Sequence, residues 1–334
     1  MRKFNVVYVT TGRVNPDGAL YYPPLVANQI NSLKPLLKSF VIIIISSLNP
    51  AFLLNKVLEL RKRVKQADIV HAQYGSLTAF LAFLGTLKQK PLIISFGGSD
   101  LLGTAGKGFK WTMRNGITKK LGLLAAEKCS KIIVKSESLL MNLSEKLRQK
   151  AIVIPNGVDV NVFYPSSKNE ARTRLGWKKH DYYVLFTPSR ANNVLVKNLP
   201  LASSAINLVQ KKMDNVYLEF ILDKTPEQVA DMMNAADCLL LTSLHEGSPN
   251  VIKEGMACNL PIVSVNVGDV AERLKEVSCS FVVDGYDKDL ISQKIMAVLN
   301  SNTRSNGLDQ LKKQGLTSEI VAKKILDIYT EVLR

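Results

Sequence analysis

Short apolar runs alternate with longer amphipathic stretches along the whole chain. The apolar runs are continuous and rich in Val and Ile, a pattern typical of parallel strands that are covered on both faces. In the first half we predict strands at 4–9, 40–46, 69–71, 91–96, 131–135 and 151–155. The stretches between them predict helices at 24–39, 51–66, 76–88, 117–129 and 136–146.

The second half repeats this alternation. Its predicted strands are 182–187, 216–221, 238–242, 261–265 and 280–283. Its predicted helices are 200–213, 226–236, 249–258, 269–277 and 287–300. In the last stretch, 317–332, Val321, Ile325, Ile328 and Val332 recur at helical spacing, which predicts an amphipathic helix.

The alternation in both halves predicts an α/β fold with two doubly wound, Rossmann-like domains. The boundary falls in the segment 154–165, IPNGVDVNVFYP, where prolines and Asn-Gly interrupt the periodic pattern. We expect an N-terminal domain at 1–155, a C-terminal domain at 156–316, and a helix at 317–334 that could cross back to the first domain. Ligands of such folds bind outside the carboxyl ends of the strands, so we expect a central cleft between the domains.

Composition excludes several classes of protein. Hydrophobic residues make up 46% and charged residues 22% of the 334 residues, which argues against a disordered or fibrous chain. The longest apolar run, 40–45, is far shorter than the roughly 20 residues of a membrane span. The N-terminus lacks a signal-peptide cleavage site, so we expect a cytoplasmic protein. The four cysteines have no CxxC spacing, which predicts buried free thiols rather than a zinc site or disulfides.

Basic residues are in excess in the first half only. Residues 1–155 hold 23 Lys and Arg against 7 Asp and Glu, a net charge of +16 (23 − 7), whereas 156–334 hold 21 of each. This asymmetry indicates a polyanionic partner: nucleic acid, an anionic membrane or a phosphorylated substrate. A lysine-rich solvated surface is the alternative.

The most informative segment is 239–269, in which a predicted strand is followed by the loop SLHEGSPN and a helix. Ser248 fits an N-cap and Pro249 the first helical position. A helix that begins at the carboxyl end of a parallel strand directs its free N–H groups at a phosphate. Glu246 and Glu254, in the loop and the helix, could accept hydrogen bonds from hydroxyl groups. Taken alone, each glutamate could equally be an ordinary solvated residue.

Two basic residues precede this segment. Arg190 follows a predicted strand, and Lys197 comes seven residues later. A diphosphate needs fixed positive charge, and each charge-assisted hydrogen bond contributes roughly 1.5–3 kcal/mol. We find no DxD metal motif that fits, because the DKD at 287–289 stands where it would cap a helix. We therefore predict that no metal is required.

Together these motifs resemble the donor domain of the retaining family 4 glycosyltransferases, which have the GT-B fold. The E-x7-E motif matches Glu246 and Glu254, and the strand-end Arg and following Lys match Arg190 and Lys197. The segments VHAQYG at 70–75 and SFGGSDL at 95–101 resemble the acceptor-side loops, and the region of Gly18 resembles the glycine-rich loop. The resemblance covers nearly the whole chain.

The resemblance implies roles for these residues. Arg190 and Lys197 would hold the leaving diphosphate, Glu254 the ribose hydroxyls and Glu246 the donor-sugar hydroxyls. Backbone N–H groups around three further residues of the loop and helix would contact the distal phosphate. These residues are Ser248, Asn250 and Val251. The donor would be a nucleotide-diphosphate sugar, with no separate cofactor, and the anomeric configuration would be retained.

The chain departs from the family at several positions. Gly97 stands where many members have histidine, and Asn198 replaces a glycine. Asp100 is an acceptor-contact candidate that could instead cap its loop, and His71 could face the cleft or pack in the core. One strand–helix unit is missing between 216 and 237, where the family holds the base, so the identity of the nucleotide stays open.

The basic segment 107–122, KGFKWTMRNGITKKLG, interleaves five basic residues with apolar anchors. This pattern suits peripheral binding to an anionic membrane, at ~1 kcal/mol per basic residue. We therefore expect the acceptor to be a lipid-linked saccharide on the cytoplasmic face, or a polyanionic glycan precursor. An exposed, solvated loop is the alternative.

Three other functions are alternatives to a glycosyltransferase. A GT-B nucleotide-sugar epimerase needs additional acids and histidines, and the chain has only 3 His. A nucleic-acid-binding protein is suggested by basicity alone, since zinc-finger, RNP and recognition-helix patterns are missing and aromatics are 7%. A dinucleotide-dependent oxidoreductase needs G-x-G-x-x-G after the first strand, and TTGRVNPDGAL does not supply it.

Overall fold

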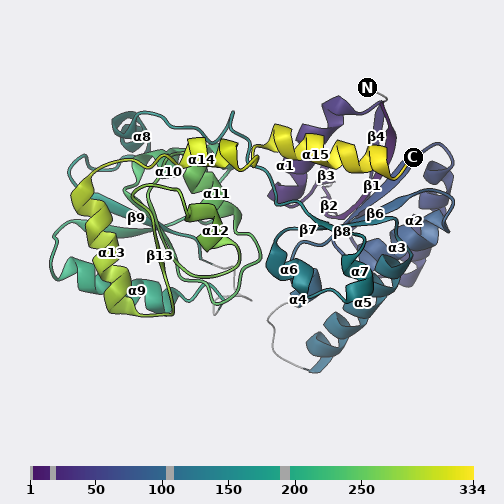
Figure 1. Cartoon of the computed structure of the whole chain (residues 1–334), viewed down its shortest axis with the longest axis horizontal. Coiled ribbons are helices and arrows are strands. Elements are labelled where there is room, and N and C mark those ends of the chain that lie inside the picture. Colours follow the sequence, from purple (N-terminus) through teal and green to yellow (C-terminus); the bar gives the residue numbers. More distant parts are fainter. Residues whose placement is uncertain (1–2, 16–19, 103–108, 189–195) are drawn as a thin grey trace. The chain divides into compact units, whose positions relative to one another are not determined.

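The computed structural model describes residues 3–15, 20–102, 109–188 and 196–334, and of 14, 24, 25, 99, 102 and 109–115 the backbone only. It divides into two compact units. The first comprises Met1–Gly157 together with Ser318–Arg334, and the second comprises Val158–Thr317. Each unit is built on its own parallel sheet (Figure 1).

The first unit contains a six-stranded parallel sheet in the order β4-β1-β5-β6-β7-β8. Its strands are β1 (Asn5–Thr11), β4 (Ser39–Ile45), β5 (Ile69–Gln73), β6 (Leu92–Ser95), β7 (Lys131–Val134) and β8 (Ala151–Val153). Two short strands, β2 (Arg13–Val14) and β3 (Leu20–Tyr21), form a separate antiparallel pair. Apolar side chains fill both faces of the large sheet, as the continuous apolar strands predict.

Helices cover both faces of this sheet. They are α1 (Pro24–Leu33), η1 (Lys34–Leu36), α2 (Pro50–Val64), α3 (Leu77–Thr86), α4 (Ser99–Leu102), α5 (Phe109–Lys128), α6 (Glu137–Met141), α7 (Glu145–Arg148) and the C-terminal α15 (Ser318–Glu331). Helix α15 packs beside α1 (Figure 1). Its Tyr329 is fully buried against Ile69, Ile93 and Ile133 of three strands.

The second unit contains a five-stranded parallel sheet in the order β10-β9-β11-β12-β13. The strands are β9 (Tyr182–Phe186), β10 (Val216–Phe220), β11 (Cys238–Leu241), β12 (Ile262–Val265) and β13 (Phe281–Val283). The helices are α8 (Lys168–Leu175), α9 (Leu199–Gln210), α10 (Pro226–Ala235), α11 (Asn250–Ala257), α12 (Val270–Leu274), α13 (Lys288–Ser301) and α14 (Gly307–Lys313). The two parallel sheets with their helices confirm the predicted α/β class.

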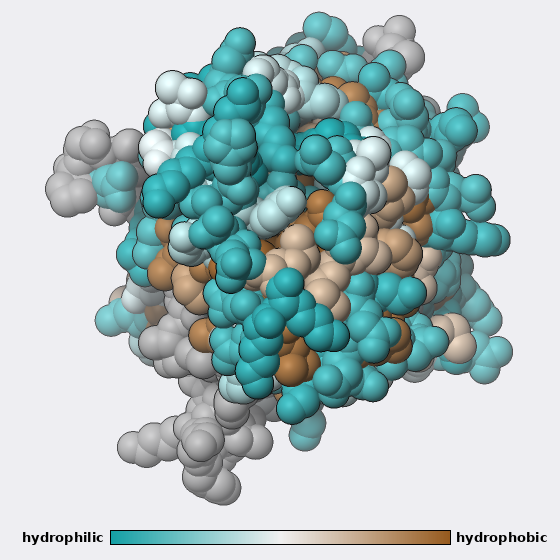
Figure 2. Space-filling view, turned by 90° about the vertical axis from the view of Figure 1, so that its left-hand side faces the viewer, coloured by the Kyte–Doolittle hydropathy of each residue, from teal (hydrophilic) through white to brown (hydrophobic). Residues whose placement is uncertain are grey.

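The second unit is short at one edge of its sheet. Along the chain, helix α10 is the only helix between β10 and β11. In the sheet, β10 pairs with β9 alone and is therefore an edge strand. Tyr217 and Phe220 on this strand are 40% and 42% exposed, which is unusual for large apolar side chains in a strand. The surface in Figure 2 is nevertheless mainly hydrophilic, with a limited group of apolar side chains near its centre.

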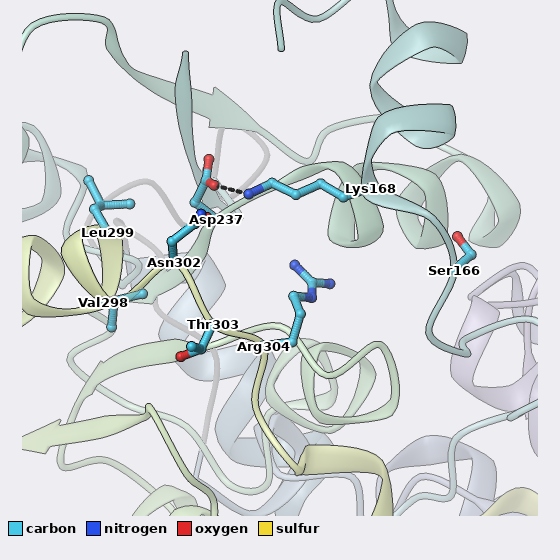
Figure 3. Close-up of a pocket in the computed structure, with 8 residues that line it drawn as sticks. All are labelled: Ser166, Lys168, Asp237, Val298, Leu299, Asn302, Thr303 and Arg304. Carbon is cyan, nitrogen blue, oxygen red and sulfur yellow. Dashed lines mark hydrogen bonds and ion pairs between the residues drawn. The ribbon is translucent and has the colours of Figure 1, made fainter. Parts of the chain in front are cut away.

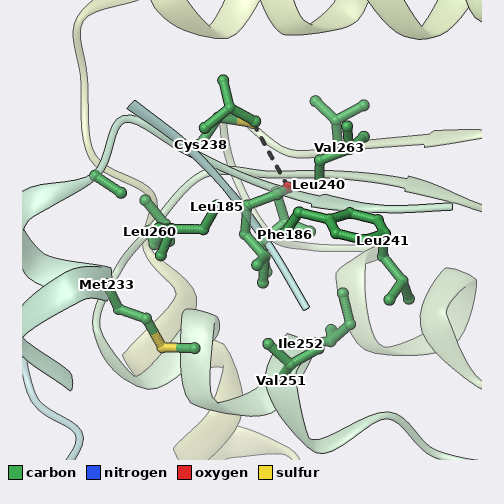
Figure 4. Packing of buried hydrophobic residues seen from close by; sticks show 14 of the residues in the cluster. Leu185, Phe186, Met233, Cys238, Leu240, Leu241, Val251, Ile252, Leu260 and Val263 are labelled. Atoms are coloured by element: carbon green, nitrogen blue, oxygen red, sulfur yellow. Dashed lines mark hydrogen bonds between the residues drawn. The ribbon is translucent and has the colours of Figure 1, made fainter. Parts of the chain in front are cut away.

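The core of the second unit fixes the start of α11. Val251 and Ile252, in the first turn of this helix, lie close to Leu241 of β11 and Phe186 of β9 (Figure 4). Both strands end at this level of the sheet. The first turn of α11 is therefore held at the carboxyl ends of β9 and β11 by apolar contacts.

The sequence predicts that the chain has no membrane-spanning helix and that its four cysteines are buried thiols. Among the described helices, none has the length and apolar character that crossing a bilayer would require. All four cysteines are free thiols, but Cys279 is only partly buried, so the prediction of four buried thiols is wrong there. Cys279 lies in a left-handed turn before β13, with φ of 55°, and its Sγ contacts the Thr303 hydroxyl at 3.1 Å.

Candidate active site

Three loops meet at the carboxyl end of the second sheet, after β9, β11 and β12. The loop after β9 ends in Lys197, and the loop after β11 carries Glu246. The Lys197 ammonium donates a hydrogen bond to Glu246 Oε1 at 2.5 Å, and the two side chains are 21% and 17% exposed. Residues 49 positions apart in the sequence are thus brought into one partly buried, charged pair.

Hydrogen bonds to backbone carbonyl groups hold these loops together. The Thr242 hydroxyl, directly after β11, donates hydrogen bonds to the carbonyl oxygens of Lys197 at 2.9 Å and Asn198 at 3.1 Å. The Leu244 N–H donates to the Val196 carbonyl at 2.7 Å. The position of Lys197 is therefore set by the strand end that also leads to Glu246.

Gly268, in the loop after β12, completes this packing. Its φ is 60°, and a Cβ there would lie 2.6 Å from the Gly247 carbonyl oxygen and 3.0 Å from that of Glu246. Any side chain would be strained and would also displace the Glu246 loop. The glycine of the Asn-Val-Gly-Asp sequence thus lets the two loops lie against each other.

Helix α11 begins one residue later than predicted. Its N-cap is Pro249, with φ −67° and ψ 123°, and no side chain caps it. The Ser248 hydroxyl instead accepts a hydrogen bond from Lys253 Nζ at 3.1 Å, so the prediction of a Ser248 cap is wrong. Among the residues that the structure describes, the first backbone N–H groups of the helix, at Asn250 and Val251, therefore have neither an intrahelical nor a side-chain capping partner.

Buried polar atoms without partners mark the same region. The described part of the chain offers no hydrogen-bond partner to Thr187 Oγ1 after β9, Ser243 Oγ after β11 or Asn250 Oδ1 at the start of α11. Buried polar groups are nearly always hydrogen-bonded, so these atoms are suited to a polar ligand. Sequence reasoning missed Thr187 and Ser243, although their places directly after strand ends could have drawn attention to them.

Glu254 lies one helical turn beyond Asn250. Burial raises the pKa of its carboxyl group to about 7, while the neighbouring Lys253 ammonium opposes the rise. Lys253 is completely buried. A carboxylate with a pKa near neutrality loses its charge easily, and hydrogen bonds from a ligand's hydroxyl groups would favour the charged form.

Two predicted site residues lie outside the described residues. Arg190 falls in the segment 189–195 and Gly18 in the segment 16–19. Of the four residues predicted to hold the diphosphate and the sugars, the structure thus describes Lys197, Glu246 and Glu254. The part played by Arg190 stays a prediction.

On the first unit, Asp100 caps its own loop. Its carboxylate accepts hydrogen bonds from the backbone N–H groups of Gly75 at 2.6 Å, Gly97 at 3.0 Å and Gly98 at 2.8 Å. Burial raises the Asp100 pKa, and these N–H groups oppose the rise. The structure therefore corrects its assignment as an acceptor contact, because its oxygens already hold two acceptor-side loops together.

His71 is a core residue, and its assignment to the substrate site is wrong. The side chain is 0% exposed, with Nδ1 2.6 Å from the Tyr329 hydroxyl and Nε2 2.8 Å from Ser95 Oγ. Burial, reinforced by the charge of Lys135, lowers its pKa to about 3. A neutral imidazole with both nitrogens engaged has no capacity left for a substrate.

A pocket of about 200 Å³ lies elsewhere in the second unit (Figure 3). Its lining includes Lys168, Asp237 and Arg304. Lys168 and the buried Arg172 both pair with Asp237, and Arg304 donates to the carbonyl groups of three residues. These three residues are Met233, Ala236 and Cys258. The cations are thus used to bind the chain to itself, before β11 rather than after it.

Possible metal ligands were also compared with the structure. In the described ranges, no three His, Cys, Asp or Glu side chains gather as a metal site would require. Asp287 Oδ1 accepts hydrogen bonds from the N–H groups of Asp289 and Leu290, at 2.8 and 3.2 Å. The prediction that this DKD sequence caps a helix, α13, is confirmed.

Comparisons with known proteins identify the chain's family. Residues 5–162 match the family model described as Glycosyltransferase Family 4, and residues 169–315 match the one described as Glycosyl transferases group 1. The chain belongs to the family 4 glycosyltransferases. The resemblance inferred from Glu246, Glu254 and Lys197 is thereby confirmed at the level of the family.

Individual relatives are distant from this glycosyltransferase. The glycosyltransferase MJ1178 of Methanocaldococcus jannaschii is 26% identical over 74% of this chain and 70% of its own length. TuaC of Bacillus subtilis, a glycosyltransferase named for teichuronic acid biosynthesis, is 24% identical over 64% of this chain and 56% of its own length.

The fold of the glycosyltransferase is GT-B. Anabaena HepE, solved in complex with UDP-glucose, superimposes with a TM-score of 0.71 over 98% of this chain and 99% of HepE. The two sequences are 14% identical, so this likeness establishes the fold alone. The predicted fold class is confirmed.

Proposed function

We propose that this glycosyltransferase moves a sugar from a nucleotide-diphosphate sugar to a saccharide acceptor, with retention of anomeric configuration and without a metal. The observation that carries the proposal is the Lys197–Glu246 pair at 2.5 Å beside the open start of α11. HepE, of the same fold, is solved with UDP-glucose, which supports a nucleotide sugar as donor. Retention and metal independence rest on the resemblance to the retaining members of the family.

The chemistry of the second unit suits the departure of a diphosphate. Cleaving the bond between sugar and phosphate leaves negative charge on the phosphate oxygens. The Lys197 ammonium and the N–H groups of Asn250 and Val251 are fixed donors that would stabilise this charge without reorganising. Glu246 holds Lys197 in place and would bind the sugar hydroxyls, and Glu254 would bind the ribose.

Incubation with a panel of UDP-, GDP- and ADP-sugars in excess EDTA tests this function. We expect slow release of one nucleoside diphosphate by transfer to water, because the described residues proposed to bind the donor all belong to the second unit. The anomer of the released sugar, followed by NMR before mutarotation, reports retention or inversion. Absence of release and of binding across the panel would contradict the proposal, and activity lost in EDTA would contradict metal independence.

We further propose a lipid-linked acceptor in cell-surface glycan synthesis, on the cytoplasmic face of the membrane. TuaC, named for teichuronic acid biosynthesis, supports such a pathway. In the described part of α5, Lys119 and Lys120 are exposed, and Ile117 and Leu124 are 51% and 54% exposed. Basic and apolar side chains on one helix suit peripheral membrane binding.

Sedimentation with vesicles tests the membrane proposal. We expect the protein to pellet with phosphatidylglycerol vesicles at low salt and to be released at about 0.5 M salt, where charge interactions are screened. Phosphatidylcholine vesicles should not retain it. Lys119→Glu with Lys120→Glu should weaken binding, whereas Lys288→Glu, an exposed position in the second unit, should not. Equal binding to both vesicle types would contradict the electrostatic basis.

A further inference from the structure

Lys135 is a buried cation that the donor chemistry does not use. It directly follows β7, at the carboxyl end of the first sheet, and is 2% exposed. The Phe96 N–H donates to the Ile133 carbonyl and the Ile154 N–H to the Val134 carbonyl. These bonds place the end of β7 between the loop after β6 and the chain after β8.

The charge of Lys135 is retained at neutral pH. Burial lowers its pKa to about 8, and the Asp100 carboxylate opposes the decrease. At pH 7 roughly nine-tenths of the molecules therefore carry the ammonium form. His71, the other titratable group with which Lys135 interacts, is neutral there because its pKa is about 3.

The Lys135 ammonium nevertheless makes no hydrogen bond within the part of the chain that the structure describes. Asp100 supplies charge but no acceptor, since its oxygens are engaged by the N–H groups of Gly75, Gly97 and Gly98. An ammonium group has three donors, and in a side chain that is only 2% exposed these donors have little access to water, which is costly. Groups held at such a cost are found preferentially at functional sites.

We propose that Lys135 binds an anionic group of the acceptor, a phosphate or a carboxylate. This inference rests on the proposed function and deepens it by giving the acceptor a chemical class. Phosphate esters of lipid-linked acceptors and carboxylates of acidic sugars both offer oxygens for charge-assisted hydrogen bonds. The net charge of +16 in residues 1–155 fits the same class of ligand.

NMR of the full-length protein labelled with 13C at the lysine ε-carbons tests the proposal. The resonance that disappears in Lys135→Met identifies Lys135, and its titration midpoint is followed with excess UDP occupying the donor site. Methyl phosphate and glucuronate are the two probes. We expect one of them to raise the Lys135 midpoint, because an anion stabilises the ammonium, and the stronger probe distinguishes phosphate from carboxylate.

Variants provide the quantitative readout. Lys135→Met and Lys135→Gln should each raise the dissociation constant of the probe at least about tenfold. This change corresponds to the loss of one charge-assisted hydrogen bond. Lys62→Met, an exposed lysine of the same unit, should leave it unchanged. An unchanged midpoint with both probes, or wild-type affinity in both Lys135 variants, would overturn the proposal. A UDP-glucose titration of the same proteins without added UDP tests the donor site separately, so the two failures can be distinguished.

Discussion

Replacing Lys197 by alanine should lower the rate of sugar transfer by roughly 100- to 1,000-fold, the usual effect of removing one fixed donor to a developing negative charge. The ammonium lies 2.5 Å from Glu246 Oε1 in a side chain that is only 21% exposed, so water would replace it poorly. Glu246→Gln should cause a comparable loss, because it removes the partner that orients Lys197 and a proposed acceptor for the sugar hydroxyls. Steady-state release of nucleoside diphosphate measures both effects.

Two controls separate catalysis from folding. Lys288→Ala removes an exposed cation of the same unit and should leave the rate unchanged. Both site variants should unfold cooperatively near the wild-type temperature, since a partly exposed pair contributes modestly to stability. Near-native rates in Lys197→Ala, or unfolding of both variants at room temperature, would contradict the assigned roles.

The double variant tests whether Lys197 and Glu246 act as a unit. If Glu246 acts partly by orienting Lys197, the loss in the double variant should be smaller than the product of the two single losses. Fully multiplicative effects would indicate that the two side chains act independently on the donor. That outcome would leave Glu246 with a contact to the sugar alone.

The elements that the sequence predicted best are those with strong apolar periodicity. All eleven strands predicted from apolar runs are present in the two large sheets, within a few residues at each end. Helix α8 was missed because its sequence, KNEARTRL, has no apolar stripe and buries only Ala171 and Arg172. The predicted helix 136–146 is divided into α6 and α7, with Ser144 as the N-cap of α7.

The candidate site shows the same limit. Lys197 and Glu246, both assigned to the donor site by the resemblance, lie within hydrogen-bond distance because both follow strand ends and parallel strands end at one edge of the sheet. The functions of Asp100 and His71 depend on which partners reach their polar atoms, and those partners come from distant segments. Tyr329, which contacts His71, is 258 positions away, and no local pattern indicates it.

Binding of UDP-glucose should strengthen as pH rises from 5 to 8, because Glu254 must be charged to accept hydrogen bonds from both ribose hydroxyls. Burial places its pKa at about 7 in the free protein. A ligand that favours the carboxylate lowers this pKa, so binding releases a proton, and affinity increases until the pH exceeds about 7. If the bound-state pKa returns to an ordinary value near 4.3, the dissociation constant should fall by up to roughly 80-fold over this range.

Isothermal titration with UDP-glucose is the appropriate measurement, since its diphosphate has no group that ionises between pH 5 and 8. Glu254→Gln should bind more weakly at pH 8 and lose the pH dependence. His245→Gln is the matched control, because His245 adjoins Glu246 in the same loop. It should keep the slope. If the slope disappears in His245→Gln and persists in Glu254→Gln, the pH dependence does not come from Glu254 and the proposed ribose contact is wrong.

The raised pKa of Glu254 also predicts how the stability of the free protein depends on pH. A carboxyl group whose pKa is raised on folding binds more protons in the folded state, so its contribution to stability decreases as pH rises from about 4.5 through about 7. Glu254→Gln should therefore be more stable than the wild type above pH 7 and lose this advantage at acid pH. Glu254 would thus lower the stability of the free protein above pH 7 and increase its affinity for UDP-glucose. The hydrogen bonds from the ligand would offset the cost of burying the charged carboxylate.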